Sequence, residues 1–157
     1  MPWYESIKKE LLAYIRTENL ETISIVGHSM GGNLAVDIAA ELPDLVKNLV
    51  IVDAIPCMRD LMMPGITANQ LHYNSSYNNQ MLKMSEESFR ETAIMMAKQM
   101  TNNTQKTDSL IKWILAADRE TYVYGYTDLL KLDLREVLHK IKAETLILGA
   151  PFPEMKQ

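Results

Sequence analysis

Residues 27 to 32 read Gly27-His28-Ser29-Met30-Gly31-Gly32. A β-branched run at 22–26 precedes them, and a helix-forming run at 33–40 follows them. This order predicts a strand, a sharp turn that carries Ser29, and a helix. Such a turn needs small residues two positions before and two positions after the serine, and Gly27 and Gly31 occupy those positions. We therefore expect a nucleophilic serine on a strand-to-helix turn.

The helix after the turn also bears on the chemistry at Ser29. Its first N–H groups have no acceptor within the helix, and its positive dipole end points back at the serine, where a tetrahedral intermediate would place an oxyanion. The N–H of Met30 is thus a candidate oxyanion donor. The alternative is a Gly-Ser turn that binds an anion, or nothing, before a helix.

The six-residue stretch resembles the nucleophile elbow of the α/β-hydrolase superfamily, and the resemblance extends from about Trp3 to Ala150. It implies a serine hydrolase that acts on an ester, a thioester or a related acyl compound through an acyl-serine on Ser29. Acyl transfer to an acceptor other than water would use the same residues. His28 occupies the variable position of the elbow, so we interpret it as a packing or hydrogen-bonding residue of the substrate pocket, not as the general base.

The composition bounds the class of protein. The 157 residues are 47% hydrophobic, which is enough for one core, and the formal net charge is −4. Because there is no block of Lys and Arg, we expect a small-molecule acyl substrate and neither nucleic acid nor membrane as a partner. Cys57 is the single cysteine, and the first residues lack a signal-peptide pattern, so we expect a cytoplasmic protein. Neither a metal site nor a cofactor is expected, because no His, Cys and carboxylate cluster has ligand spacing.

Three continuous apolar runs, at 22–26, 49–52 and 145–148, predict parallel strands that are covered on both faces. The predicted helices around them are 3–17, the helix that follows Ser29 and stops at Pro43, and 134–141. The fold class is therefore α/β, with Ser29 at the carboxyl edge of the sheet, where open α/β sheets bind their ligands.

Residues 54–132 carry no strong strand signal. The segment is expected to hold a polar loop at 69–79 and helices near 86–100, 107–117 and 119–131. The α/β-hydrolase superfamily inserts a helical cap after its sixth strand, at this place in the order. We therefore expect a partial α/β-hydrolase fold, with parallel strands and flanking helices in a core of residues 1–53 and 133–157, and a helical cap insertion at 54–132.

Eight of the eleven methionines lie in this inserted segment. Flexible methionine side chains suit a pocket that adapts to acyl chains, and the pocket candidates are Met58, Met62 and Met63. A stripe at helical spacing is instead expected to be buried in the core of the helices. That stripe consists of Phe89, Ala93, Met96 and Met100.

A nucleophilic serine needs a general base and a group that orients the base. In the superfamily the chain order is serine, acid, histidine, with the histidine late in the chain. The sequence has three histidines, and none follows the strand at 145–148. We expect His72 to be a solvated loop residue and His139 to lie on the surface or at a helix end.

The acid is open to more than one interpretation. Phe152 stands where superfamily members usually carry an aspartate after the seventh strand, and Glu154 is the one carboxylate beyond that strand. Asp53 follows the sixth strand, an alternative position for the acid, or it is a turn residue that accepts bonds from nearby amides. Asp128 and Asp133 are interpreted as polar residues that flank the cap helices.

The superfamily also has four strands before the serine strand, which the residues before Trp3 are too few to supply. We therefore interpret the chain as a fragment of a longer hydrolase in which Ser29 is idle without the missing parts. Unpaired strand edges and apolar faces predict self-association of the truncated sheet. A non-catalytic binding or scaffold protein that keeps the elbow as architecture is the competing hypothesis.

Overall fold

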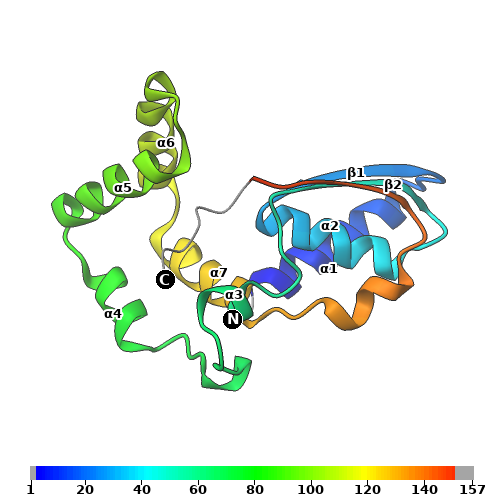
Figure 1. Ribbon diagram of the computed structural model, residues 1–157, viewed down its shortest axis with the longest axis horizontal. Helices are drawn as coiled ribbons and strands as arrows, with labels where there is room; N and C mark the ends of the chain where they lie inside the picture. Colours follow the sequence, from blue (N-terminus) through cyan, green and yellow to red (C-terminus); the bar gives the residue numbers. More distant parts are fainter. Residues whose placement is uncertain (1–2, 151–157) are drawn as a thin grey trace. The chain divides into compact units, whose positions relative to one another are not determined.

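The computed structural model describes residues 3–150 of the chain (Figure 1). The chain divides into two compact units. Unit 1 comprises the described residues up to Gln70 and from Asp128 onward, and unit 2 is Leu71–Thr127. Unit 2 lies within the cap insertion expected at 54–132, and the assignment of a cap stays a prediction.

Unit 1 is an α/β structure, which confirms the predicted fold class. Its strands are parallel and lie in the order β1-β2-β3. Its elements are α1 (Trp3–Thr17), β1 (Ile23–His28), α2 (Met30–Glu41), β2 (Val46–Val52), α3 (Met58–Met62), the 3-10 helices η1 (Ala68–Gln70) and η2 (Arg135–Lys140), and β3 (Glu144–Leu148). Each predicted strand is present, although β1 extends through the first two elbow residues and β2 begins at Val46. The helix predicted at 134–141 is instead η2, a short 3-10 turn without a capping side chain at Leu134.

The core of unit 1 lies between the sheet and its helices. Figure 1 shows α1 and α2 on the same side of the three strands. Leu49 in the central strand is fully buried, and it packs with Val46, Ala35 and Ala39 in the main cluster. Burial of these apolar surfaces is the main stabilising contribution, and it holds the start of α2 against the strands.

The described elements of unit 1 leave the opposite face of the sheet uncovered, contrary to the expectation that both faces are covered. Val26, Val50 and Leu146 lie side by side across the three strands, and Val26 and Leu146 are 70% and 53% exposed. Leu148 is also exposed. The sequence alone does not reveal the uncovered face. A continuous apolar run indicates that a strand favours burial on both faces, but it does not indicate which element covers each face. The predicted self-association rests on this face and stays a prediction.

A buried polar network joins α1 to α2. The Tyr4 hydroxyl donates to Asp37 Oδ2 at 3.4 Å, and Lys8 Nζ lies 3.1 Å from the same oxygen. Burial raises the pKa of Tyr4, and the Asp37 carboxylate raises it further. Asp128 Oδ2 accepts the backbone N–H of Tyr4 at 3.0 Å, so this carboxylate satisfies one of the unpaired donors at the start of α1.

Four charged side chains link α3 to the segment before η2. Arg59 is buried, lies 3.8 Å from Asp133, and donates to the carbonyl oxygens of Leu130 and Lys131. Arg135 pairs with Asp133 and, at 2.5 Å, with Asp60. Asp133 therefore acts as an ion-pair partner and not only as a polar flanking residue.

The Asp133 pairs predict an acid-dependent contribution to stability. Hydrogen bonds from Arg135 lower the pKa of the Asp133 carboxyl from 3.8 to about 2. A carboxyl whose pKa is lower in the folded state than in the unfolded state contributes stability at pH values above the unfolded pKa. This contribution is lost as the pH falls through about 4 to 2. We expect Asp133→Asn to lower the free energy of unfolding by up to about 1 kcal/mol at pH 7 and by little at pH 2, because the pairs are partly solvated. Urea unfolding at both pH values measures this, and an equal loss at both would contradict it.

Unit 2 is helical. It contains α4 (Ser76–Lys83), α5 (Glu86–Met100), α6 (Thr104–Ala116) and the first part of α7 (Arg119–Lys131). The last three helices confirm the predicted ones. The predicted polar loop at 69–79 is wrong from Ser76 onward, because the Ser75 hydroxyl accepts the N–H of Asn78 and starts α4.

The buried stripe of α5 also differs from the prediction. Phe89, Ala93 and Ala97 are buried in the core of unit 2, and Met96 packs partly against them. Met100 is 59% exposed, so the expectation that it lies in the core is wrong. Helical spacing places Met100 on the same face as Phe89 and Ala93, so its exposure depends on the neighbouring helices and not on the periodicity of α5.

Candidate active site

Ser29 lies on the turn between β1 and α2. Its backbone has φ 51° and ψ −126°, a conformation that is costly for a residue with a side chain. The Ser29 N–H donates to the carbonyl of Val52 at 2.9 Å, which ties the turn to the neighbouring strand. The side chain makes no capping hydrogen bond to α2, although serine is a favoured capping residue. The Ser29 hydroxyl is thus not used to cap the helix, which is the ordinary role of a serine at this position.

Two glycines make this turn sterically feasible. A Cβ on Gly27 would lie 2.3 Å from the carbonyl oxygen of Gly31, and a Cβ on Gly32 would lie 2.5 Å from the Cβ of Ala54. A Cβ on Gly31 would meet nothing within 4 Å. The expectation that a close approach of strand and helix requires a small residue at 31 is therefore wrong: a Cβ there would point into open space, and Gly32 is the residue packed against the chain after β2.

The first N–H groups of α2 follow Ser29 directly. The N–H groups of Gly32 and Asn33 donate to the carbonyl of Ser29 at 2.8 and 3.2 Å. The N–H groups of Met30 and Gly31 come before these, at positions that have no acceptor within a helix. Met30 is half-buried beside the serine, and its role as an oxyanion donor stays a prediction.

Asn33 is a residue of the site that the sequence did not single out. Its side chain is buried, and Nδ2 donates to the carbonyl oxygen of Ile55 at 2.8 Å. The bond fastens the first turn of α2 to the chain that leaves β2. A polar residue in a mostly apolar helix stretch was the available signal, because such a residue needs a partner when it is buried.

Asp53 follows β2 and also has a positive φ, of 50°. Its N–H donates to the carbonyl of Leu148 at 2.7 Å, and its Oδ1 accepts the N–H of Ala150 at 3.3 Å. The side chain is exposed. The side chain thus accepts a hydrogen bond from the segment after β3, and both the turn role and the role as the acid stay predictions. Glu154, the other carboxylate considered, lies outside the described residues.

The three histidines lie on different elements. His28 is the last residue of β1, pairs in register with Val52, and is exposed. His72 is an exposed residue of the loop before α4 in unit 2. His139 is exposed on η2, which leads into β3 and therefore lies at the amino edge of the parallel sheet, opposite the edge that carries Ser29.

Met58, Met62 and Met63 lie on or next to α3, in unit 1. Met58 is half-buried, and Met62 and Met63 are 54% and 37% exposed. Exposed flexible side chains are available to a ligand, so a role in a substrate pocket stays a prediction for them.

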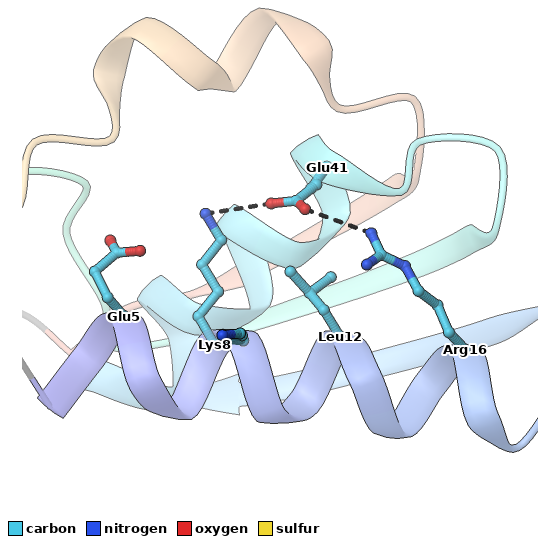
Figure 2. Close-up of a pocket in the computed structure, with 6 residues that line it drawn as sticks. Glu5, Lys8, Leu12, Arg16 and Glu41 are labelled. Carbon is cyan, nitrogen blue, oxygen red and sulfur yellow. Dashed lines mark ion pairs between the residues drawn. The ribbon is translucent and has the colours of Figure 1, made fainter.

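A second hollow in unit 1 lies between α1 and α2 and is charged (Figure 2). Glu41 in this hollow is 3.3 Å from Lys8 and 3.7 Å from Arg16. Burial lowers the pKa of Lys8, but the Asp37 and Glu41 carboxylates outweigh burial and raise it above its usual value. Because the carboxylates already neutralise these cations, we assign no ligand to this hollow.

Within residues 3–150, no helix is both long enough and apolar enough to cross a bilayer. Over the same range, no group of three or more His, Cys, Asp or Glu side chains is arranged to hold a metal ion.

Comparison with known proteins gives a family and a fold. A family model described as alpha/beta hydrolase fold matches residues 6–128. The mouse sn-1-specific diacylglycerol lipase ABHD11 is 40% identical over 53 residues, which are 34% of this chain and 17% of the lipase. Ethanol acetyltransferase 1 of Cyberlindnera fabianii is 26% identical over 119 residues, 71% of this chain and 33% of that protein. The chain spans a third or less of the length of these two relatives.

Among solved structures, a hydrolase from Pseudomonas aeruginosa PA01 superimposes with a TM-score of 0.70 at 17% identity. The match covers 93% of this chain and 53% of that one. At this identity the likeness shows the fold alone.

Proposed function

Because the chain belongs to the alpha/beta hydrolase fold family, we propose that it carries the nucleophile of a serine hydrolase acting on an ester, a thioester or a related acyl compound. The observation that supports this most is the backbone of Ser29, held at φ 51° between β1 and α2 with its hydroxyl not used as a helix cap. Strain of this kind persists only where the surrounding structure enforces it, and it is concentrated at functional sites.

In the proposed reaction the Ser29 hydroxyl oxygen attacks the carbonyl carbon of the acyl compound while a general base takes the hydroxyl proton. The N–H of Met30 stabilises the negative charge that develops on the carbonyl oxygen. Collapse of the intermediate expels the alcohol or thiol, which receives the proton, and leaves an acyl-serine. Water then attacks the acyl-serine, releases the carboxylic acid and restores the hydroxyl. Asp53 is the candidate to orient the base.

The proposed reaction also needs a general base for Ser29. In the described residues the histidines are exposed and lie on β1, in unit 2, and at the amino edge of the sheet. We therefore propose that residues 3–150 alone are catalytically idle and that a base has to come from outside them. The single buried cysteine supports a reducing, cytoplasmic location.

Acyl transfer is a second candidate function, and a specific observation favours it. One relative is named as an ethanol acetyltransferase, and its match covers 71% of this chain. The acyl-serine would then react with an alcohol in place of water, through the same Ser29 and Met30. A scaffold protein without turnover is the third candidate, and the positions of the histidines support it.

Product analysis distinguishes the three. The chain, with any flanking sequence that its gene encodes, is incubated with p-nitrophenyl butyrate in the presence and absence of ethanol, and the products are separated by gas chromatography. We expect Ser29-dependent butyric acid in water. If ethyl butyrate is the main product when ethanol is present, the function is acyl transfer and not hydrolysis. Absence of both products, in a protein that unfolds cooperatively, would contradict the enzyme and favour the scaffold.

A further inference from the structure

Unit 2 holds an apolar pocket of about 300 Å³ between α4, α5 and α7, and this pocket is open to solvent at its rim. Met81 of α4 and Val123 of α7 line it and are almost fully buried, which makes them its floor. Tyr77, Met100 and Tyr126 line it and are exposed, which makes them its rim. Every lining residue belongs to unit 2, so the pocket exists within that unit.

The lining selects for an uncharged ligand. It contains methionine, tyrosine and valine side chains and no Lys, Arg, His, Asp or Glu. A charged ligand would lose its hydration there without gaining a partner. The volume is roughly twice the ~150 Å³ of an engineered cavity that binds one benzene, so a ligand of about twelve heavy atoms fits.

The Tyr122 hydroxyl in the pocket has a weak hydrogen-bond acceptor. The Tyr122 hydroxyl donates to the sulfur of Met96 at 3.3 Å, and a thioether sulfur is a weak hydrogen-bond acceptor. Burial raises the pKa of Tyr122, and the nearby Tyr77 and Tyr126 phenols raise it further, so the hydroxyl stays protonated. A carbonyl oxygen that entered the pocket would be a stronger acceptor for this donor than Met96.

Methionine side chains also let the pocket adjust to a flexible ligand. Met81, Met96 and Met100 can change rotamer at low cost, unlike branched side chains, and so can follow an aliphatic chain. The ring of Tyr122 is fixed by an edge-on contact with Phe89 at 6.3 Å, which holds its hydroxyl in place.

We propose that this pocket binds a neutral, medium-chain aliphatic carbonyl compound, with its chain among the methionines and its carbonyl oxygen accepting a hydrogen bond from Tyr122. Binding here requires no chemistry at Ser29, so the inference goes beyond the proposed function and does not depend on it.

The test uses 2-decanone, a ketone of suitable size that a serine hydrolase cannot hydrolyse. The full chain is labelled with ¹³C at its methionine methyl groups and titrated by NMR. We expect saturable shifts of the Met81, Met96 and Met100 signals, while the signal of Met95, which is exposed on α5 but does not line the pocket, stays constant. Decanoate should shift none of them. Shifts of all methionines alike, or equal binding of decanoate, would overturn the proposal.

Two variants and one control variant sharpen the test. Tyr122→Phe keeps the ring that packs on Phe89 and should weaken 2-decanone about three- to tenfold, the worth of one hydrogen bond, while leaving decane unchanged. Met100→Trp should block the pocket, and Met95→Trp on the same helix should not. Unchanged 2-decanone affinity in both Tyr122→Phe and Met100→Trp would refute the proposal. Methyl-signal dispersion reports whether each variant is folded.

Discussion

Replacing Ser29 with alanine is expected to abolish covalent labelling by a fluorophosphonate and to lower ester turnover on the order of 10⁴-fold or more, in the chain with any flanking sequence that its gene encodes. The reason is chemical: alanine has no oxygen to form the acyl or phosphonyl bond, and no other group on the turn replaces it. Because alanine has the same Cβ as serine, the backbone strain at position 29 is unchanged. Labelling is measured by gel fluorescence and mass spectrometry.

Ser24→Ala is the matched control. Ser24 is an exposed serine of the same strand, and its hydroxyl oxygen accepts a hydrogen bond from Asn48 at 2.9 Å. Its loss should leave labelling intact. A label that persists in Ser29→Ala, or that disappears in Ser24→Ala with the fold preserved, would remove Ser29 from the proposed mechanism.

Gly27→Ala should have the largest effect on stability. The new Cβ would lie 2.3 Å from the carbonyl oxygen and 2.6 Å from the carbonyl carbon of Gly31, and 2.7 Å from the Cα of Gly32. All three atoms are backbone, so the strand and helix must separate, and we expect a loss of about 3 kcal/mol or more in the free energy of unfolding. Urea denaturation followed by circular dichroism measures the loss.

Gly31→Ala provides the contrast within the same turn. An added Cβ there meets open space, and alanine favours a helix over glycine by up to about 1 kcal/mol. We expect Gly31→Ala to leave stability unchanged or to raise it slightly. Similar losses of unfolding free energy in Gly27→Ala and Gly31→Ala would show that Gly27 is not required for the close approach of β1 and α2.

The sequence predicted the elbow because its signals are local. A β-branched run, two flanking glycines and a helix-forming run each act within a few residues of Ser29, and the structure has the turn where they placed it. The prediction for Gly31 was wrong because a sequence pattern gives the position of a residue but not the direction in which its Cβ would point. Only the path of the chain after β2, which brings Ala54 against Gly32, distinguishes the two glycines.

Contacts between distant segments account for the rest of what the sequence did not show. Asp53 was found from its place after an apolar run, but its bonds to Leu148 and Ala150 depend on which strand lies beside β2. Met100 continues the helical spacing of α5 yet is exposed, because it lines the rim of a pocket and not the packed core. Hydrophobic periodicity identifies the buried face of a helix, but it does not show how far the neighbouring helices cover that face.

The pairing of β2 with β3 has a consequence for the order in which the chain folds. The two strands are joined through all of unit 2, from Val52 to Glu144, so closing this long loop costs entropy that the adjacent pair β1 and β2 does not incur. During synthesis, α1 through β2 emerge and can associate first, and β3 docks late. The bonds that orient Asp53 come from Leu148 and Ala150, so the candidate acid is set only at this last step, long after the serine turn has formed.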